Sequence, residues 1–257
     1  MDIYNNGNIA QYKQEGKQQI VNVVKKSAIY IYFAIALALT GLVAFSTPYA
    51  YEYALNNSER LFNFLITTAS VSSIVVLLPI SIYMAISSSR NREGKSPVLM
   101  GVMFTLYALF MGLIIGTILF AILKTEGSNA IRLVSYAFLI TAGVFLLCGI
   151  IGSLAKDLSP ALSIVGSLII GSLVLALLNI FLKSNVISWI ISFAFLLFIL
   201  VITAYDFHII NKIAGRSTFG NPNITAMYCA FTIYTDFVIL FIRILYILLI
   251  FFGNSKK

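Results

Sequence analysis

Residues 225–251 have the sequence TAMYCAFTIYTDFVILFIRILYILLIF, in which Asp236 and Arg243 are the only charged side chains. The run is 27 residues long. A helix needs about 20 mostly apolar residues to cross the hydrocarbon core of a bilayer. The run therefore predicts a transmembrane helix that carries one charge of each sign inside the membrane.

Six more apolar runs precede this one, at residues 28–46, 61–86, 98–123, 131–154, 160–182 and 186–210. Of the 257 residues, 60% are hydrophobic and 10% are charged, and the mean hydropathy is +0.97. Soluble domains carry about 25% charged residues, so this composition excludes an ordinary soluble domain. Because lipid offers no partners to backbone amides, and the runs do not alternate as barrel strands do, the runs must be helices.

We therefore predict an all-α integral membrane protein. It has a polar amino-terminal segment at residues 1–27, a domain of seven transmembrane helices at 28–252 and a short tail at 253–257. The lipid bilayer is its first partner. Short connections between the runs place neighbouring helices antiparallel, so we expect a compact bundle.

The sequence gives no sign of an enzyme. It contains no Gly-rich phosphate loop, no nucleophile elbow and no Cys and His metal cluster. Tyr205-Asp206 is similar to the first motif of intramembrane aspartyl proteases, but their second motif has glycines before the aspartate. Here Ile233-Tyr234-Thr235 precedes Asp236. We expect neither catalysis nor a bound organic cofactor.

The positive charges predict the orientation, because loops rich in Lys and Arg remain in the cytoplasm. With the amino terminus inside, the cytoplasmic segments hold ten Lys and Arg residues and the opposite side holds six. This distribution favours a cell-membrane protein with a cytoplasmic amino terminus and, after seven spans, an external carboxyl terminus. Lys256 and Lys257 favour the reverse.

Asp206 and Asp236 are the two acids within the apolar runs. Their midpoint is position 221, inside the turn sequence FGNPN at residues 219–223. In an antiparallel hairpin, residues equidistant from the turn lie at similar depth, so we expect the two carboxylates to face each other. An ionisable group in the membrane costs at least ~2.5 kcal/mol and usually marks a functional site.

This pair has three interpretations. Two carboxylates in a dry site repel when both are ionised, so they can share a proton and form a pH-controlled gate. They can also contact Ca²⁺, which takes about six to eight oxygen ligands. The structural alternative is that each aspartate only bonds a neighbouring tyrosine or backbone group.

Two further residues near the pair have open roles. Arg243 follows Asp236 by seven residues, nearly on the same helical face, and can pair with an acid or extend to the surface. His208 lies two residues after Asp206, where it can sense pH or make only a polar contact.

Small residues predict helix packing. Gly112 and Gly116 have the spacing that lets two membrane helices approach closely, and we expect them to pack helices within one chain. Cys148 and Cys229 both lie in apolar runs, so we expect buried thiols without a disulfide.

Three segments resemble parts of one known family. Residues 204–210 (AYDFHII) are similar to a Tyr-Asp-x-Gln-x-Ile segment, 233–241 (IYTDFVILF) to Leu-Tyr-x-Asp-Phe-x-Asn-Leu-Phe, and 155–160 (AKDLSP) to a Lys-Asp-Leu-Ser loop. These are segments of the Bax inhibitor family, also called the transmembrane Bax inhibitor motif family. The resemblance covers roughly residues 20–253.

The resemblance implies a seven-helix fold in which a central helix is wrapped by the others. It also implies a pH-dependent passive calcium leak, gated by aspartates that match Asp206 and Asp236, with Ca²⁺ and protons as the ions. A basic residue near the end of the second span latches one aspartate in that family. Arg90 and Arg92 are the candidates here.

Two other functions fit the same features. A non-transporting regulator would bind a membrane protease or another membrane protein, and the polar segment 2–26 would be its docking element. A proton-coupled cation exchanger would use the acid pair for antiport. Dependence of flux on a counter-gradient separates this exchanger from a leak.

Overall fold

The computed structural model describes residues 23–89, 96–127, 129–214 and 221–253. These residues form seven helices: α2 (Lys26–Asn57), α3 (Glu59–Ser89), α4 (Pro97–Glu126), α5 (Asn129–Leu154), α6 (Ser159–Leu182), α7 (Asn185–Ile213) and α8 (Pro222–Gly253). All seven are long and apolar enough to cross a membrane. The predicted all-α fold with seven membrane-spanning helices is confirmed.

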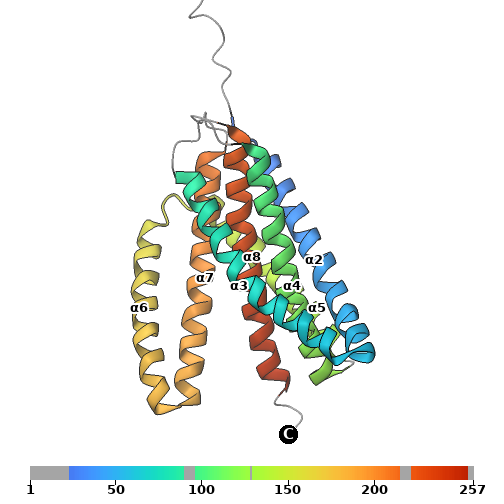
Figure 1. Cartoon of the computed structure of the whole chain (residues 1–257). Helices are drawn as coiled ribbons and strands as arrows, with labels where there is room; N and C mark the ends of the chain where they lie inside the picture. The colour runs from blue at the N-terminus through green and yellow to red at the C-terminus, as the bar shows by residue number, and fades with distance from the viewer. Residues whose placement is uncertain (1–22, 90–95, 128, 215–220, 254–257) are drawn as a thin grey trace, which may run out of the picture.

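Helix α8 is the centre of the bundle (Figure 1). It packs against α2, α3, α4, α5 and α7, whereas α6 packs against α7 at the edge of the molecule. Ile233, Tyr234 and Leu240 of α8 are completely buried. The residues of the last apolar run therefore form the core around which the other helices are arranged.

The helix bounds agree with the predicted runs to within three residues, except at the end of α2. The run was expected to end at residue 46, just before Pro48, but the helix continues through this proline to Asn57. Thr47 donates a hydrogen bond to the carbonyl oxygen of Val43, 2.7 Å away, one turn earlier. Beyond the proline, Tyr51 and Ala54 are buried. Tertiary packing thus maintains the helix where local sequence predicts a break.

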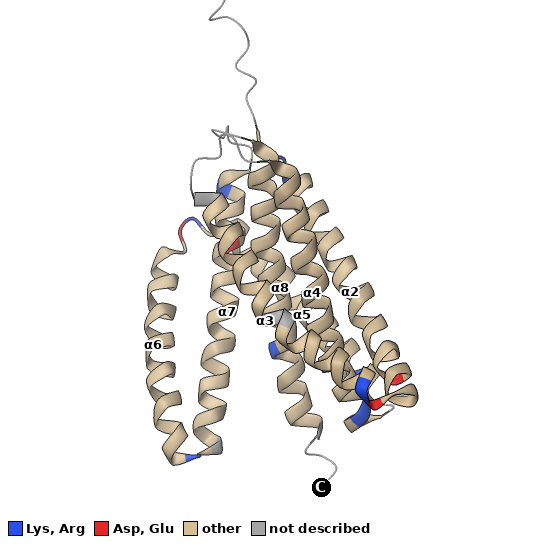
Figure 2. Ribbon diagram, in the orientation of Figure 1, with Lys and Arg blue, Asp and Glu red and all other residues tan. Residues whose placement is uncertain are grey.

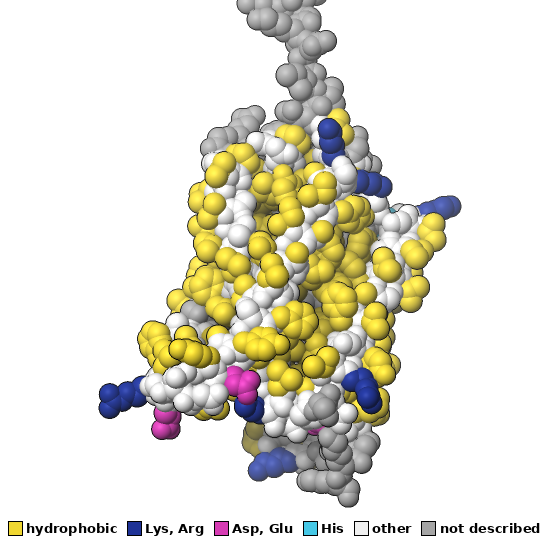
Figure 3. Space-filling model, turned by 90° about the vertical axis from the view of Figure 1, so that its right-hand side faces the viewer, with side chains coloured by type: hydrophobic (Ala, Val, Ile, Leu, Met, Phe, Trp, Pro, Cys, Tyr) yellow, Lys and Arg dark blue, Asp and Glu magenta, His cyan; other side chains and the backbone are white. Residues whose placement is uncertain are grey.

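Most charged residues lie near the two ends of the helices, and a few lie within the bundle (Figure 2). Between these ends lies a broad apolar band, which Figure 3 shows on the face formed by the right-hand side of Figure 1. Many large apolar side chains are exposed, among them Leu42, Leu139 and Phe181. A soluble protein rarely exposes so large an apolar surface, whereas a bilayer covers it.

Helices α2 and α4 approach closely at the two glycines of the small-residue motif. A Cβ atom at Gly112 would lie 2.8 Å from the carbonyl oxygen of Thr40, and one at Gly116 would lie 2.9 Å from that of Ala44. Both distances are too short for a real Cβ. As expected from the sequence, the motif packs two helices of the same chain.

We predict that Gly116→Val destabilises the folded protein by about 1–3 kcal/mol, the usual cost of overpacking. The free energy of unfolding in detergent, measured with a denaturant, tests this. Gly143→Val is the matched control, because a Cβ at Gly143 meets no atom within 4 Å. Equal unfolding midpoints for the two variants would contradict the packing role of Gly116.

Candidate functional site

Asp206 of α7 and Asp236 of α8 lie within hydrogen-bonding reach of each other. Asp236 is only 8% exposed, and Asp206 is half-buried. A hydrogen bond between two carboxyl groups needs a proton on one of them, because a carboxylate can only accept. A hydrogen bond between these two groups would therefore require at least one proton on the pair. Asp236 Oδ2 has no hydrogen-bond partner within the described residues.

The two aspartates lie at different distances from the helix ends that the connecting turn joins. Asp206 lies seven residues before the end of α7, about 10 Å along the axis, whereas Asp236 lies 14 residues after the start of α8, about 21 Å. Equal depth from a symmetric turn was expected. The structure brings the carboxyl groups together because α8 extends farther than α7 at this end of the bundle (Figure 1).

Residues just before Asp236 fix α8 against α2 and α4. Tyr234 is completely buried, and its hydroxyl lies 2.5 Å from Thr40 Oγ1 of α2. Thr40 Oγ1 also lies 3.0 Å from the carbonyl oxygen of Ala108 in α4. The ring of Tyr234 packs edge-on against those of Phe104 and Tyr107, with centroids 5.6 and 6.2 Å apart. This side of α8 is held against two helices, α2 and α4, at one level.

On the other side, α7 packs closely against α5. A Cβ at Gly152 of α5 would lie 2.8 Å from the Cβ of Phe207, the residue after Asp206. The ring of Phe207 lies 5.0 Å from that of Phe145, which in turn lies 5.2 Å from that of Phe237. The residues that follow the two aspartates are thus joined through one aromatic ring of α5.

His208 is buried beside this contact, with 5% of its surface exposed. Its Nδ1 lies 3.2 Å from the carbonyl oxygen of Gly152. A carbonyl only accepts, so Nδ1 carries the proton and donates. Nε2 is buried and has no partner in the described part of the chain. His208 therefore makes a polar contact to α5, one of the two roles left open by the sequence.

Arg243 lies apart from the aspartate pair. Its Nη2 donates to the carbonyl oxygen of Ser192 in α7, 3.1 Å away, and its guanidinium lies over the rings of Phe195 and Tyr246, 5.0 and 5.7 Å from their centroids. The expected alternatives were an acid or the surface, and the structure gives a backbone carbonyl and two rings. Arg90 and Arg92, the candidate latch residues, lie outside the described residues.

The two carboxylates alone provide too few ligands for a complete metal site. In the ranges that the structure describes, no group of three or more His, Cys, Asp and Glu side chains is placed to hold a metal ion. Because Ca²⁺ takes about six to eight oxygen ligands, a calcium ion at this pair would need water or backbone oxygens as well. Cys148 of α5 lies near enough to interact electrostatically with Asp236, and its thiol donates to the carbonyl oxygen of Leu200, 3.6 Å away.

Sequence reasoning singled out the two aspartates and His208 but missed the groups that position them. Thr40, Ala108 and Gly152 are ordinary residues of apolar helices, and only their partners across the bundle give them a role. Tyr234 carried a weak signal, since a tyrosine in an apolar run needs a partner for its hydroxyl.

Comparisons with known proteins give a consistent result. The sequence model of a family described as "Inhibitor of apoptosis-promoting Bax1" matches residues 22–253. The chain is 26% identical over 233 residues to "Inner membrane protein YbhL" of Escherichia coli strain K12, which covers 89% of this chain and 90% of that protein. It is 27% identical over 250 residues to an uncharacterized protein of Deinococcus radiodurans, with 96% of each chain covered. No solved structure gives a significant match.

We predict that the contact between Tyr234 and Thr40 stabilises the protein by about 0.5–1.5 kcal/mol, the usual net contribution of a hydrogen bond. A double-mutant cycle with Tyr234→Phe and Thr40→Val, measured as free energies of unfolding in detergent, isolates this coupling. Tyr53→Phe is the control, because Tyr53 is 68% exposed and should change stability by less than about 0.5 kcal/mol. A coupling energy near zero would contradict the assigned contact.

Proposed function

The chain belongs to the Bax inhibitor family, and from this premise and the aspartate pair we propose that it is a passive, proton-regulated cation leak in a cell membrane. Calcium is the proposed cargo. The observation that carries the proposal is the contact between the carboxyl groups of Asp206 and Asp236 inside an apolar bundle.

The pair can act as a gate because its contact depends on one proton. With the proton shared, the two carboxyl groups are joined by a hydrogen bond and α7 remains against α8. Without it, two negative charges face each other in a medium of low dielectric constant, where repulsion is much stronger than in water. Separation of the helices at this level then relieves the repulsion and admits water.

The sign of the pH dependence follows. Low pH keeps the shared proton and the closed arrangement, whereas rising pH removes the proton and favours the open one. Once open, two carboxylates lining a wet path attract cations and repel anions. Oxygen ligands of this charge suit Ca²⁺ in particular.

We predict that Asp236→Asn abolishes the pH dependence. The amide of asparagine donates a hydrogen bond to the Asp206 carboxylate at any pH, so the closed arrangement should persist when the pH rises. Calcium flux into indicator-loaded liposomes should fall at least about tenfold at high pH, the effect of about 1.4 kcal/mol on the gating equilibrium. The remaining flux should be independent of pH.

Asp157→Asn is the matched control for this experiment. Asp157 lies between α5 and α6, and its Oδ1 accepts a hydrogen bond from the backbone N–H of Ser159, which lowers the pKa of this exposed carboxyl. Asparagine can make the same bond, so flux and its pH profile should match those of the unchanged protein. Flux that is indifferent to both pH and Asp236→Asn would overturn the leak proposal.

The same liposomes separate the leak from a proton-coupled exchanger. A leak carries calcium down its own gradient when the internal and external pH are equal. An exchanger needs an opposing proton gradient. Flux that vanishes at equal pH would replace the leak by antiport at the same pair, and absence of flux under both conditions would favour a non-transporting regulator.

We further propose that the amino terminus faces the cytoplasm. The similar protein of Escherichia coli is named as an inner membrane protein, and Lys and Arg are more numerous on the amino-terminal side of the spans. Alkaline phosphatase, which is active only outside the cytoplasm, should be active when fused after Gly253 and inactive when fused after Lys156. The opposite pattern would reverse the orientation.

A further inference from the structure

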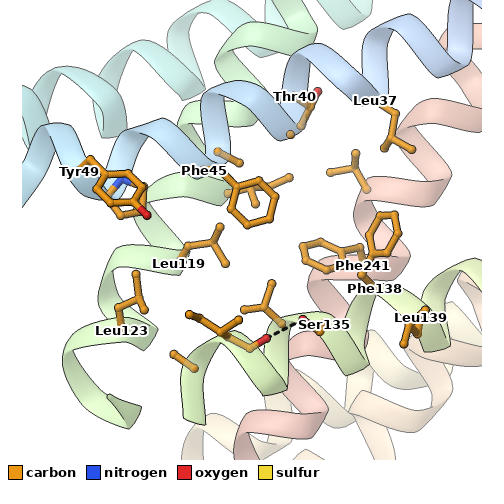
Figure 4. A pocket seen from close by; sticks show the side chains of 18 of the residues that line it. Leu37, Thr40, Phe45, Tyr49, Leu119, Leu123, Ser135, Phe138, Leu139 and Phe241 are labelled. Atoms are coloured by element: carbon orange, nitrogen blue, oxygen red, sulfur yellow. Dashed lines mark hydrogen bonds between the residues drawn. The ribbon is translucent and has the colours of Figure 1, made fainter. Parts of the chain in front are cut away.

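A cavity of about 750 Å³ lies between α2, α4, α5 and α8, and neither aspartate of the pair is among its lining residues. Figure 4 shows Phe45, Leu119, Phe138 and Phe241, one from each of these helices, around its open space. Its volume is within the range of about 300–1,000 Å³ that is typical of sites for small molecules.

The walls of this cavity are mostly apolar, and the hydroxyl groups of Thr40 and Ser135 in its lining are already bonded. Thr40 Oγ1 is bonded to Tyr234 and to backbone carbonyl oxygens, and the Ser135 hydroxyl donates to the carbonyl oxygen of Ile131, 2.8 Å away. An ordered water needs about two to four polar partners. The interior therefore favours hydrocarbon over water.

The cavity is elongated and has a polar end. Its lining on α2 extends from Leu37 to Glu52, 15 residues or about 22 Å along the helix axis. At the outer end Glu52 pairs with Lys124 of α4 at 3.5 Å, and both side chains are more than 45% exposed. At the inner end lies Phe237, whose ring is 6.0 Å from that of Phe33.

The cavity is therefore amphipathic along its length, with charge at one end and apolar side chains along the rest. The ring of Phe33 on α2 stacks on that of Phe145 on α5, with centroids 5.6 Å apart, beyond the inner end of the lining. Half of a hydrocarbon core about 30 Å thick is about 15 Å. A hydrocarbon chain that enters the cavity at the level of Glu52 and Lys124 therefore reaches past the midplane of the bilayer.

We propose that this cavity binds one acyl chain of a phospholipid from the leaflet on the side of Glu52 and Lys124. The apolar lining accepts the chain, and the ion pair lies at the level of the phosphate and glycerol groups. The bilayer supplies this occupant wherever the protein spans a membrane. Because Phe237 lies at the inner end of the cavity, the acyl chain contacts the residue that follows Asp236.

Gly41 gives a sharp test of the site. It lines the cavity, and a Cβ there would meet no atom within 4 Å, so the side chain introduced by Gly41→Leu can begin in open space and occupy the volume of the acyl chain. Gly166→Leu on α6 is the matched control, because a Cβ at Gly166 also meets nothing within 4 Å but does not line the cavity. Ser135→Phe obstructs the cavity from the α5 side and serves if Gly41→Leu fails to fold.

The experiment uses the full-length protein in phosphatidylcholine vesicles that contain a phosphatidylcholine with a photoactivatable diazirine on one acyl chain. Labelled residues are identified by mass spectrometry. We expect labelling of the buried lining residues Ile115, Leu119 and Phe241 to exceed that of the exposed residues of α6. Gly41→Leu should reduce labelling in the cavity at least about tenfold, the effect of about 1.4 kcal/mol on binding, and Gly166→Leu should leave it unchanged.

Two results would overturn the proposal: labelling of the cavity no stronger than that of α6, or equal labelling of the cavity in Gly41→Leu and Gly166→Leu. The experiment measures no ion flux, so its outcome is independent of the proposed leak.

Discussion

The close contact of α2 with α4 at Gly112 and Gly116 is the one on which the rest of the bundle depends. Lipid tails are as apolar as the helices, so membrane helices associate through tight packing and buried hydrogen bonds. Because α4 lies directly against α2, Thr40 reaches both the carbonyl oxygen of Ala108 and the hydroxyl of Tyr234. The position of α8, and with it that of Asp236, follows from this contact.

Buried polar groups in the middle of α2 are hydrogen-bonded, whereas several others among the described residues of the bundle are not. On the side of α2 and α4, Thr40, Thr47 and Tyr51 all have hydrogen-bond partners. Toward α7, Asp236 Oδ2 and His208 Nε2 are buried without partners within the described residues. Each such group costs about 1–3 kcal/mol. A rearrangement that gives these two atoms partners would recover part of that cost.

Much of the fold could be predicted from the sequence because hydrocarbon leaves so few choices. Seven apolar runs had to be helices, and their bounds were accurate except at the end of α2. The end of α2 was wrong because the burial of Tyr51 and Ala54, which maintains the helix beyond Pro48, depends on the other helices. Local sequence contains no information of that kind.

The candidate site could be predicted only in part, for a related reason. Two acids within apolar runs are conspicuous, and their antiparallel helices had to bring them to comparable depth. The partner of Arg243 could not be anticipated, because it is the backbone carbonyl of Ser192, a group that every residue carries. The hydroxyl contact of Tyr234 joins positions 194 residues apart, and no local pattern marks it.

The short distance from Asp206 to the end of α7 has a consequence for how the pair would respond to voltage. Seven of the 29 residues of α7 follow Asp206, about a quarter of the helix. A unit charge that crosses the whole membrane gains about 2.3 kcal/mol per 100 mV. A proton that reaches the pair from this end crosses about a quarter of that field, worth about 0.6 kcal/mol per 100 mV. If the pair exchanges protons from this end, as the proposed leak allows, its proton occupancy should depend mainly on the acidity of that compartment and only weakly on the membrane potential.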